Sequence, residues 1–384
     1  MRIGARGFVR SLLAAAVLVA ALLLAACGGG DSGIEGGADT GNVSTAAAEG
    51  KPSGTLSISN WPFYIDNQTV PDFQKATGIS VKYQEDVNDN SEFFGKMQPL
   101  LDQGESGGRD IMVVTDWMAN KMHNLGYLQD FDQEAVKPAM DNLVPSLQSP
   151  SFDPDRSFSL PWQSGMTGLV VNTAEAPDVK SINDLFDPKY KGQVEMLTEM
   201  RDTVPLVMKC QGVNLAKATE QDWLNAIDKL KSAADSGQIR RFTGNDYIRD
   251  LSSGDVDFVL GWSGDAIQMQ KDNPNIQFVM PKEGCMLWST SLEIPVGAPN
   301  PEAAQALMNY VYDPKVQADI AEWVNYVTPV KGVKAIVRKR DPELADNQLI
   351  FPSASYTKNC TFEPVLGGQL GDDVTKAFEA VLTG

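Results

Sequence analysis

The sequence predicts an α/β protein made of doubly wound lobes, each a sheet flanked by helices. Strand-like and helix-like segments alternate from about residue 54 to the carboxyl terminus. Repeated β-α-β units of this kind imply parallel sheets, and 384 residues are enough for two domains of ordinary size. Ligands of such sheets bind at the carboxyl ends of strands, so residues that follow apolar runs are the first candidates for a site.

The amino-terminal half contains two strand–helix repeats and a third strand. Alternating or continuous apolar residues mark the strands, and apolar stripes that stop at a glycine mark the helices. The predicted elements are strands at 55–59, 79–83 and 110–115, a helix at 70–77 that stops at Gly78, and a helix with the stripe Phe93, Phe94, Met97, Leu100 and Leu101 that stops at Gly104.

The same alternation continues in the second half of the chain. Asn300 precedes a helix whose first position is Pro301, which fits there because the first turn leaves its N–H groups unpaired in any case. The other predicted elements are apolar strands at 257–260 and 276–281 and a helix with the stripe Trp223, Ala226, Ile227 and Leu230.

Residues 1–26 are predicted to be a signal peptide. Three arginines precede an apolar core at 12–24, which is too short to span a bilayer and ends in small residues. The tetrapeptide LAAC (24–27) resembles a bacterial lipobox, so we expect Cys27 to become the lipidated amino terminus. A plain secretory signal, cleaved near Ala26, is the alternative.

Residues 27–52 are predicted to be a flexible tether. They contain no aromatic residue and are rich in Gly, Ala, Ser and Thr, so they bury too little surface to offset the entropy of ordering. No later segment is long and apolar enough to span a bilayer. We therefore expect an exported domain that a lipid holds at the outer face of the cytoplasmic membrane.

Composition argues against several kinds of partner. The formal net charge is −18, whereas a surface that follows nucleic-acid phosphates should be basic. His123 is the only histidine, and the cysteines that follow Cys27 are scattered, so we expect neither a zinc site nor a cofactor. We expect a monomer, and its acidity is compatible with a cationic ligand.

Five clusters of polar and aromatic residues follow or end apolar runs. They contain four of the seven tryptophans. A single tryptophan at such a position would more often belong to the core, but their recurrence predicts one cleft that is lined from both sides. The clusters are NWPFY (60–64), TDW (115–117), TEMRD (198–202), GWSGD (261–265) and LWSTS (287–291).

GWSGD resembles the turn that presents a hydrolase nucleophile, but the details disagree. Gly264 comes one residue too early for the Gly-x-Ser-x-Gly pattern, and the only available base is His123. We therefore do not expect Ser263 to be a nucleophile. A pair of carboxylates, here Glu199 and Asp202, can instead hydrolyse a sugar. A sugar ligand, or a glycan-processing lipoprotein, is thus an alternative.

A pocket for an organic cation fits these residues better. Aromatic faces attract ammonium groups, contributing about 0.5–2 kcal/mol per ring, and carboxylates fix the amines by charged hydrogen bonds. An amino-acid ligand is the other alternative, and it would need Arg156 or Arg201 to hold its carboxylate. The predicted walls are Trp61, Tyr64, Trp117, Trp262 and Trp288, and the predicted amine acceptors are Glu199, Asp202 and Asp265.

The chain resembles the spermidine/putrescine-binding proteins of bacterial ABC importers from about Gly54 onwards. The resemblance implies a two-lobed periplasmic-binding-protein fold of type II with hinge strands, a polyamine ligand, permease partners and no enzymatic activity. It is carried by NWPFYI, FQKATGISV, DLFDPKYKGQVEML, GWSGDA, MPKEGCMLW and NYVTP.

The resemblance also implies a set of ligand-binding residues. Thr290 departs from the family, whose members carry Asp there, and Pro62 and Phe63 replace small polar and acidic residues. A shorter diamine or another organic cation is therefore an alternative to a long polyamine. The set is Trp61, Tyr64, Thr115, Trp117, Glu199, Asp202, Trp262, Asp265, Trp288, Thr290, Tyr326 and Glu363.

Two further predictions concern a disulfide and the boundaries of the lobes. Cys285 lies just before Trp288, and Cys360 lies just before Glu363, so two segments that approach one cleft can bring these cysteines together and leave Cys210 unpaired. The predicted lobe boundaries are 53–162 plus 289–334 for lobe 1 and 163–288 plus 335–384 for lobe 2.

Overall fold

The computed structural model describes residues 54–364 and 366–383. The predicted signal peptide, the tether and Cys27 lie outside these residues. The strands are β1 (Thr55–Asn60), β2 (Ser80–Glu85), β3 (Ile111–Thr115), β4 (Leu160–Asn172), β5 (Val194–Leu197), β6 (Ile239–Thr243), β7 (Phe258–Trp262), β8 (Ile276–Val279), β9 (Met286–Glu293) and β10 (Thr361–Phe362).

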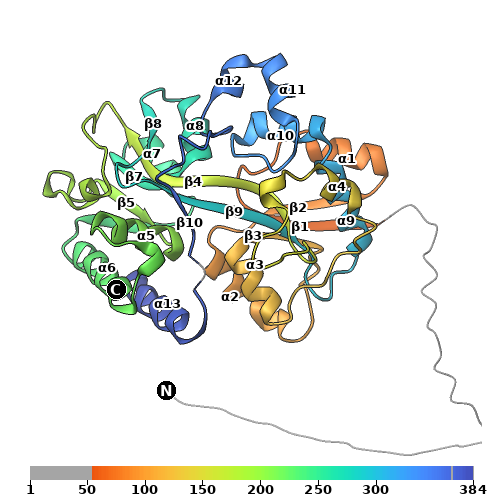
Figure 1. Cartoon of the computed structure of the whole chain (residues 1–384), viewed down its shortest axis with the longest axis horizontal. Coiled ribbons are helices and arrows are strands. Elements are labelled where there is room, and N and C mark those ends of the chain that lie inside the picture. The colour runs from red at the N-terminus through yellow and green to blue at the C-terminus, as the bar shows by residue number, and fades with distance from the viewer. Residues whose placement is uncertain (1–53, 365, 384) are drawn as a thin grey trace, which may run out of the picture. The chain divides into compact units, whose positions relative to one another are not determined.

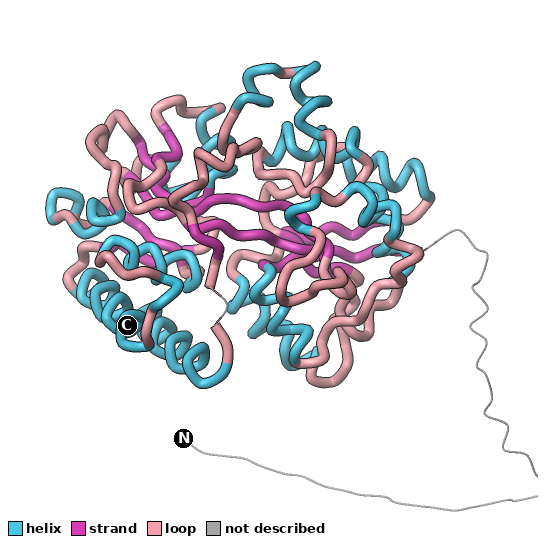
Figure 2. Tube along the Cα trace, viewed as in Figure 1, coloured by secondary structure: helices cyan, strands magenta, loops and turns pink. Residues whose placement is uncertain are grey.

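Helices surround these strands (Figure 2). The structure contains every strand and helix that the sequence analysis predicted, with ends that differ by a few residues. The α-helices are α1 (Thr69–Thr77), α2 (Asn90–Leu101), α3 (Asp116–Asn124), α4 (Lys137–Asn142), α5 (Met200–Cys210), α6 (Glu220–Asp235), α7 (Tyr247–Ser253), α8 (Ser263–Gln270), α9 (Pro301–Val311), α10 (Pro314–Val324), α11 (Val333–Arg340), α12 (Pro342–Asp346) and α13 (Gly368–Thr383).

All the described strands belong to one sheet of order β2-β1-β3-β9-β4-β7-β5-β6, with β10 beside β9 and β8 beside β4. The pairs on either side of the centre, β1 with β2 and β3 and β5 with β6 and β7, are parallel. The two central strands β4 and β9 pair antiparallel with each other and with β7, β8 and β3, whereas the short β10 pairs with β9 in parallel. Both central strands run from one end of the sheet to the other (Figure 1).

This arrangement confirms the predicted α/β class but joins the two parallel parts more closely than two separate sheets would. The ladder between β4 and β9 is continuous apart from a bulge near Pro161, so it links the β1–β3 end to the β5–β7 end. The predicted lobe boundaries fall inside β4, β9 and α11, and they stay a prediction.

Local sequence explains where the elements that carry the site begin and end. All five residues of β3 are buried, as expected for a strand covered on both faces. Helix α1 ends at Gly78, whose φ of 81° lies in the left-handed region that glycine enters without a steric cost. Helix α2 begins after Asp89, whose side chain accepts a hydrogen bond from the Glu92 N–H.

The structure forms the predicted disulfide between Cys285 and Cys360. It ties the segment before β10 to the start of β9, with which β10 pairs. Cys210, at the end of α5, is a half-buried free cysteine. Among the described residues, no helix has both the length and the apolar character needed to cross a bilayer.

Candidate functional site

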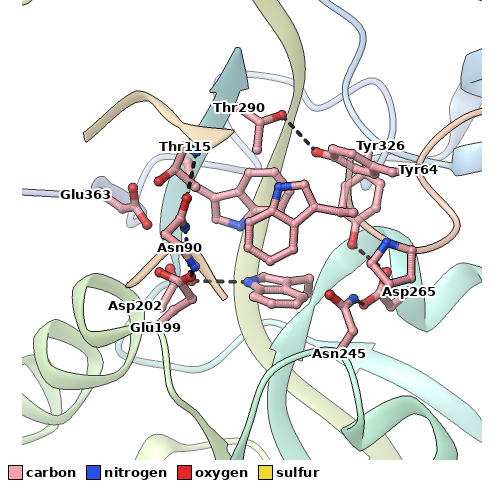
Figure 3. A pocket seen from close by; sticks show the side chains of 14 residues that line it. Tyr64, Asn90, Thr115, Glu199, Asp202, Asn245, Asp265, Thr290, Tyr326 and Glu363 are labelled. Atoms are coloured by element: carbon pink, nitrogen blue, oxygen red, sulfur yellow. Dashed lines mark hydrogen bonds between the residues drawn. The ribbon is translucent and has the colours of Figure 1, made fainter. Parts of the chain in front are cut away.

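A cavity lies where the carboxyl ends of β1, β3, β5, β6 and β7 meet (Figure 3). It draws residues from both ends of the sheet, as the cluster pattern predicted. The lining residues are Trp61, Pro62, Tyr64, Asn90, Thr115, Glu199, Asp202, Asn245, Trp262, Asp265, Trp288, Thr290, Tyr326 and Glu363.

Aromatic rings form the walls, and Trp262 lies among them. Its ring meets the rings of Trp61 and Trp288 edge-on, with centroids 5.9 and 6.4 Å apart. Tyr326 contacts Trp288 and Tyr64 in turn, at 5.4 and 5.2 Å between centroids. Because these rings support one another from different elements, they form a stiff apolar lining.

Two glycines make room for this lining. A Cβ atom on Gly165 of β4 would lie 2.4 Å from the Trp288 ring. A Cβ on Gly264 would lie 2.4 Å from the Tyr326 ring, so this glycine admits a wall residue. The same segment contains Ser263, whose hydroxyl accepts a hydrogen bond from the Met166 N–H at 3.2 Å. Ser263 is thus a structural residue of a strand-to-helix turn.

The carboxylate of Asp265 is held by neutral donors. The hydroxyls of Tyr247 and Tyr326 each donate to it at 2.6 Å, one to each oxygen, and the Asn245 amide donates at 3.3 Å. Burial raises the pKa of Asp265 to about 6, although these hydrogen bonds oppose the rise. A cation in contact with this carboxylate would restore the ionised form.

Asp202 keeps one carboxylate oxygen without a protein partner. Its Oδ2 accepts a hydrogen bond from Trp262 Nε1 at 3.1 Å, while Oδ1 is buried and unpaired. Burial raises the pKa of Asp202 to about 6. The hydroxyl of Thr115 is also a buried acceptor without a partner. Both atoms are therefore available to a donor in the cavity.

Glu199 and Glu363 complete the acidic side. Oε1 of Glu199 accepts hydrogen bonds from both the backbone N–H and the side-chain amide of Asn90, each at 2.8 Å. Burial raises the pKa of Glu199 well above its usual value, and the charge of Asp89 adds to the rise. Burial also raises the pKa of Glu363, while the charge of Arg201 partly opposes that rise.

Eleven of the twelve predicted ligand-binding residues line this cavity, and Trp117 does not. Helix α3 begins at Asp116, and the Trp117 ring lies outside the cavity under the guanidinium of Arg201, 3.7 Å from ring centroid to Cζ. Thr290, which replaces the family Asp, shares a 3.3 Å hydrogen bond with the Tyr64 hydroxyl.

The sequence analysis did not single out three polar residues of the site. Asn90 binds Glu199, while Asn245 and Tyr247 bind Asp265. Each lies at the start of a helix or in a turn, outside the aromatic clusters. An Asn before an apolar helical stripe was the only available signal for Asn90, and it is typical of any helix start.

The arginines that an amino-acid ligand would need and the only histidine lie outside the cavity. Neither Arg156 nor Arg201 lines the cavity, and the Arg156 guanidinium donates to Leu147 O and to the Ser159 hydroxyl. His123 stacks on Phe158 at 3.8 Å between centroids. Within residues 54–364 and 366–383, no group of three or more His, Cys, Asp and Glu side chains is arranged to hold a metal ion.

Comparisons with known proteins find relatives along most of the chain. The family model for bacterial extracellular solute-binding proteins matches residues 68–352. The chain is 28% identical over 325 residues to the spermidine/putrescine-binding periplasmic protein of Escherichia coli (strain K12), covering 84% of this chain and 90% of that one. It is 31% identical over 335 residues to the putrescine-binding periplasmic protein PotF of the same organism, covering 82% and 86%.

The fold has similar solved structures. A putative spermidine/putrescine ABC transporter protein from Listeria monocytogenes is 27% identical and superposes with a TM-score of 0.76, covering 85% of this chain and 98% of that one. Its likeness extends over nearly all the residues that the structure describes here.

Proposed function

The chain belongs to the family of bacterial extracellular solute-binding proteins, and from that premise we propose that its cavity captures a linear aliphatic polyamine outside the cytoplasm. Putrescine and spermidine are the candidate ligands. Relatives that cover most of the chain carry both names, which supports this class of ligand. We further propose that the protein delivers this ligand to the permease of an ABC importer.

The observation that carries the proposal is the charge of the cavity. Four of its lining residues are acids, and none is Lys, Arg or His: Glu199, Asp202, Asp265 and Glu363. Burying carboxylates is unfavourable, which is why burial raises the pKa of each, and the charge of Arg201, from outside the cavity, opposes that rise only in part for Glu363. A cationic ligand removes that cost, whereas a sugar or a carboxylate-bearing ligand does not.

The distribution of the acids supports a ligand with an amine at each end. The carboxyls of Asp202, Glu199 and Glu363 lie to one side of the aromatic rings, and Asp265 lies to the other (Figure 3). Rings without an acid between them suit methylene groups better than a third ammonium. Because Thr290 is neutral, we propose that the cavity favours a diamine over spermidine.

Calorimetric titration with four ligands tests the proposal: putrescine, spermidine, an amino acid and an oligosaccharide. We expect heat of binding from the two polyamines and none from the others, and weaker binding as salt concentration rises. Binding of the oligosaccharide alone, insensitive to salt, would contradict the polyamine proposal and favour a sugar.

The proposed lipid anchor on Cys27 is tested separately. Cys27→Ser should move the protein from the membrane fraction to the soluble fraction, because one acyl chain set at the amino terminus is the only proposed attachment. Binding of putrescine should be unchanged in the variant. A variant that still sediments with membranes would show that the anchor lies elsewhere.

A further inference from the structure

A row of hydrogen bonds joins the two ends of the sheet beside the cavity. On one side is the segment 88–90, which leads into α2. On the other are the turns that follow β5 and β6. The bonds are Asn245 N to Asn88 Oδ1 at 3.1 Å, Thr198 Oγ1 to Asp89 Oδ2 at 2.7 Å, and Asn90 N and Nδ2 to Glu199 Oε1 at 2.8 Å each.

The partners are far apart in the sequence, and the pair at the centre of the row is buried. Asn90 and Glu199 are separated by 109 positions and are 0% and 4% exposed. The Asn90 side chain bonds in two directions, because its Oδ1 also accepts the Thr115 N–H at 3.0 Å while its Nδ2 donates to Glu199. It therefore ties the end of β3, the start of α2 and the turn after β5 to one another.

Glu199 takes part in the cavity and in this row at the same time. It lines the cavity, yet one of its oxygens is occupied by two donors from Asn90. The donor from the backbone belongs to the first residue of α2, where the N–H groups of a helix are unpaired and favour an anion. With a cation in the cavity, the Glu199 carboxylate would contact the start of α2 on one side and the cation on the other.

Gly244 shows that the two sides approach too closely for a side chain. A Cβ atom on Gly244 would lie 2.3 Å from the backbone oxygen of Asn88. The φ of Gly244 is not in the left-handed region, so alanine would suit the local backbone. An alanine at this position would therefore be excluded by the close approach of the opposite side and not by its own backbone conformation.

We infer that residues 88–90 and the turns 198–199 and 244–245 form a latch that holds the two ends of the sheet together over a bound cation. Asn90 is its positioning residue, because it orients Glu199, and Gly244 is the residue whose missing side chain lets the latch close. This inference rests on the proposed function for the identity of the cation, but the latch itself involves protein groups only.

The direct test adds a methyl group between the two sides at Gly244. Gly244→Ala removes no group that contacts the cavity, so stopped-flow titration with putrescine should give an unchanged association rate and a dissociation rate raised roughly tenfold, as for the loss of one or two hydrogen bonds to a charged group. Gly95→Ala is the control, because Gly95 lies on α2 with no atom within 4 Å of its added Cβ. Its rates should equal those of the wild type.

A second variant keeps the test clear of folding defects. Asn90→Ala removes the side-chain donor to Glu199 and should also raise the dissociation rate. Amide hydrogen exchange gives a reading that does not depend on ligand: the N–H groups of Asn90 and Asn245 donate across the latch and should lose protection in Gly244→Ala, while the amides of β1 and β5 keep theirs.

The outcomes separate the two proposals. Failure of the wild type to bind any polyamine would contradict the proposed function, and the exchange experiment would still decide the latch. Wild-type dissociation rates in both variants, or unchanged exchange at the two amides in Gly244→Ala, would overturn the latch while leaving polyamine binding intact.

Discussion

The two sides of the cavity hold their carboxylates in opposite ways. Asp265 receives hydrogen bonds on both oxygens from neutral donors, the hydroxyls of Tyr247 and Tyr326. On the other side, Asp202 keeps a free oxygen, and Glu199 is bound to a distant segment through Asn90. One acid is preorganised, and the others are shared between the ligand and the closing of the protein. We therefore expect the Asp265 side to govern which cation binds and the Glu199 side to govern how long it stays.

The largest expected effect is that of pH, because it acts on both sides at once. Burial raises the pKa of Asp202 and of Asp265 to about 6, whereas aliphatic amines stay charged up to about pH 10. A cation binds the ionised acids, so affinity for putrescine should be full above pH 7 and fall by about tenfold per carboxyl between pH 7.5 and 5. Calorimetry across this range measures it.

In the ligand-free protein, the contribution of these two acids to stability should change with pH in the opposite direction to affinity. The folded state holds protons on Asp202 and Asp265 that the unfolded chain loses near pH 4, so their contribution to the free energy of unfolding decreases as pH rises from about 4 to about 6. Thermal unfolding of the ligand-free protein checks this direction. Affinity that is constant from pH 7.5 to 5 would mean that neither acid contacts a cation.

Next in size is removal of the charge on the preorganised side. Asp265→Asn keeps the shape of the side chain but removes its charge, and breaking a buried charged pair costs about 2–5 kcal/mol, so affinity for putrescine should fall at least about tenfold. Asp246→Asn, an exposed change close by, is the matched control. If Asp265→Asn binds putrescine as tightly as the wild type, this side does not receive an amine.

Removing a wall should cost less than removing a charge. Trp262→Ala deletes a ring worth about 0.5–2 kcal/mol to a cation, and it also deletes the donor to Asp202. Trp262→Phe helps to separate the two contributions, because it keeps an aromatic face while it loses the N–H and part of the ring area. Trp323→Ala, at a tryptophan outside the cavity, should leave putrescine affinity unchanged. Equal effects of Trp262→Ala and Trp323→Ala would contradict the role of the wall.

The sequence predicted one side of this comparison better than the other. Trp61, Trp262 and Asp265 follow apolar strands directly, so the rule that ligands bind at strand ends was enough to find them. Asn90 and Asn245 act through segments more than a hundred positions away, and no local pattern records such a contact. Trp117 also follows a strand, but helix α3 starts at the preceding residue and carries its ring to Arg201.

The pairing of parallel strands was predictable for the same reason, and the continuous sheet was not. Alternating strands and helices imply parallel neighbours, as β1 with β3 and β5 with β7 show. The antiparallel ladder joins β4 and β9, which start at Leu160 and Met286, 126 positions apart in the sequence. In this ladder Leu160 pairs with Leu292. Periodicity gives the length of such strands but not their partners.

The smallest expected effect is a change in the preference between spermidine and putrescine at Thr290, which lines the cavity. Thr290 is 3% exposed, and its hydroxyl bonds the Tyr64 hydroxyl and the Gln163 carbonyl. Thr290→Asp adds a carboxylate to the cavity lining, so the ratio of spermidine to putrescine affinity should rise several-fold. Thr290→Asn is the control for size without charge and should leave the ratio near that of the wild type. Competition titrations of the two amines measure the ratio directly. A rise in both variants would indicate that room, rather than charge, limits the longer amine, and a rise in neither would mean that the ligand does not pass beside Thr290.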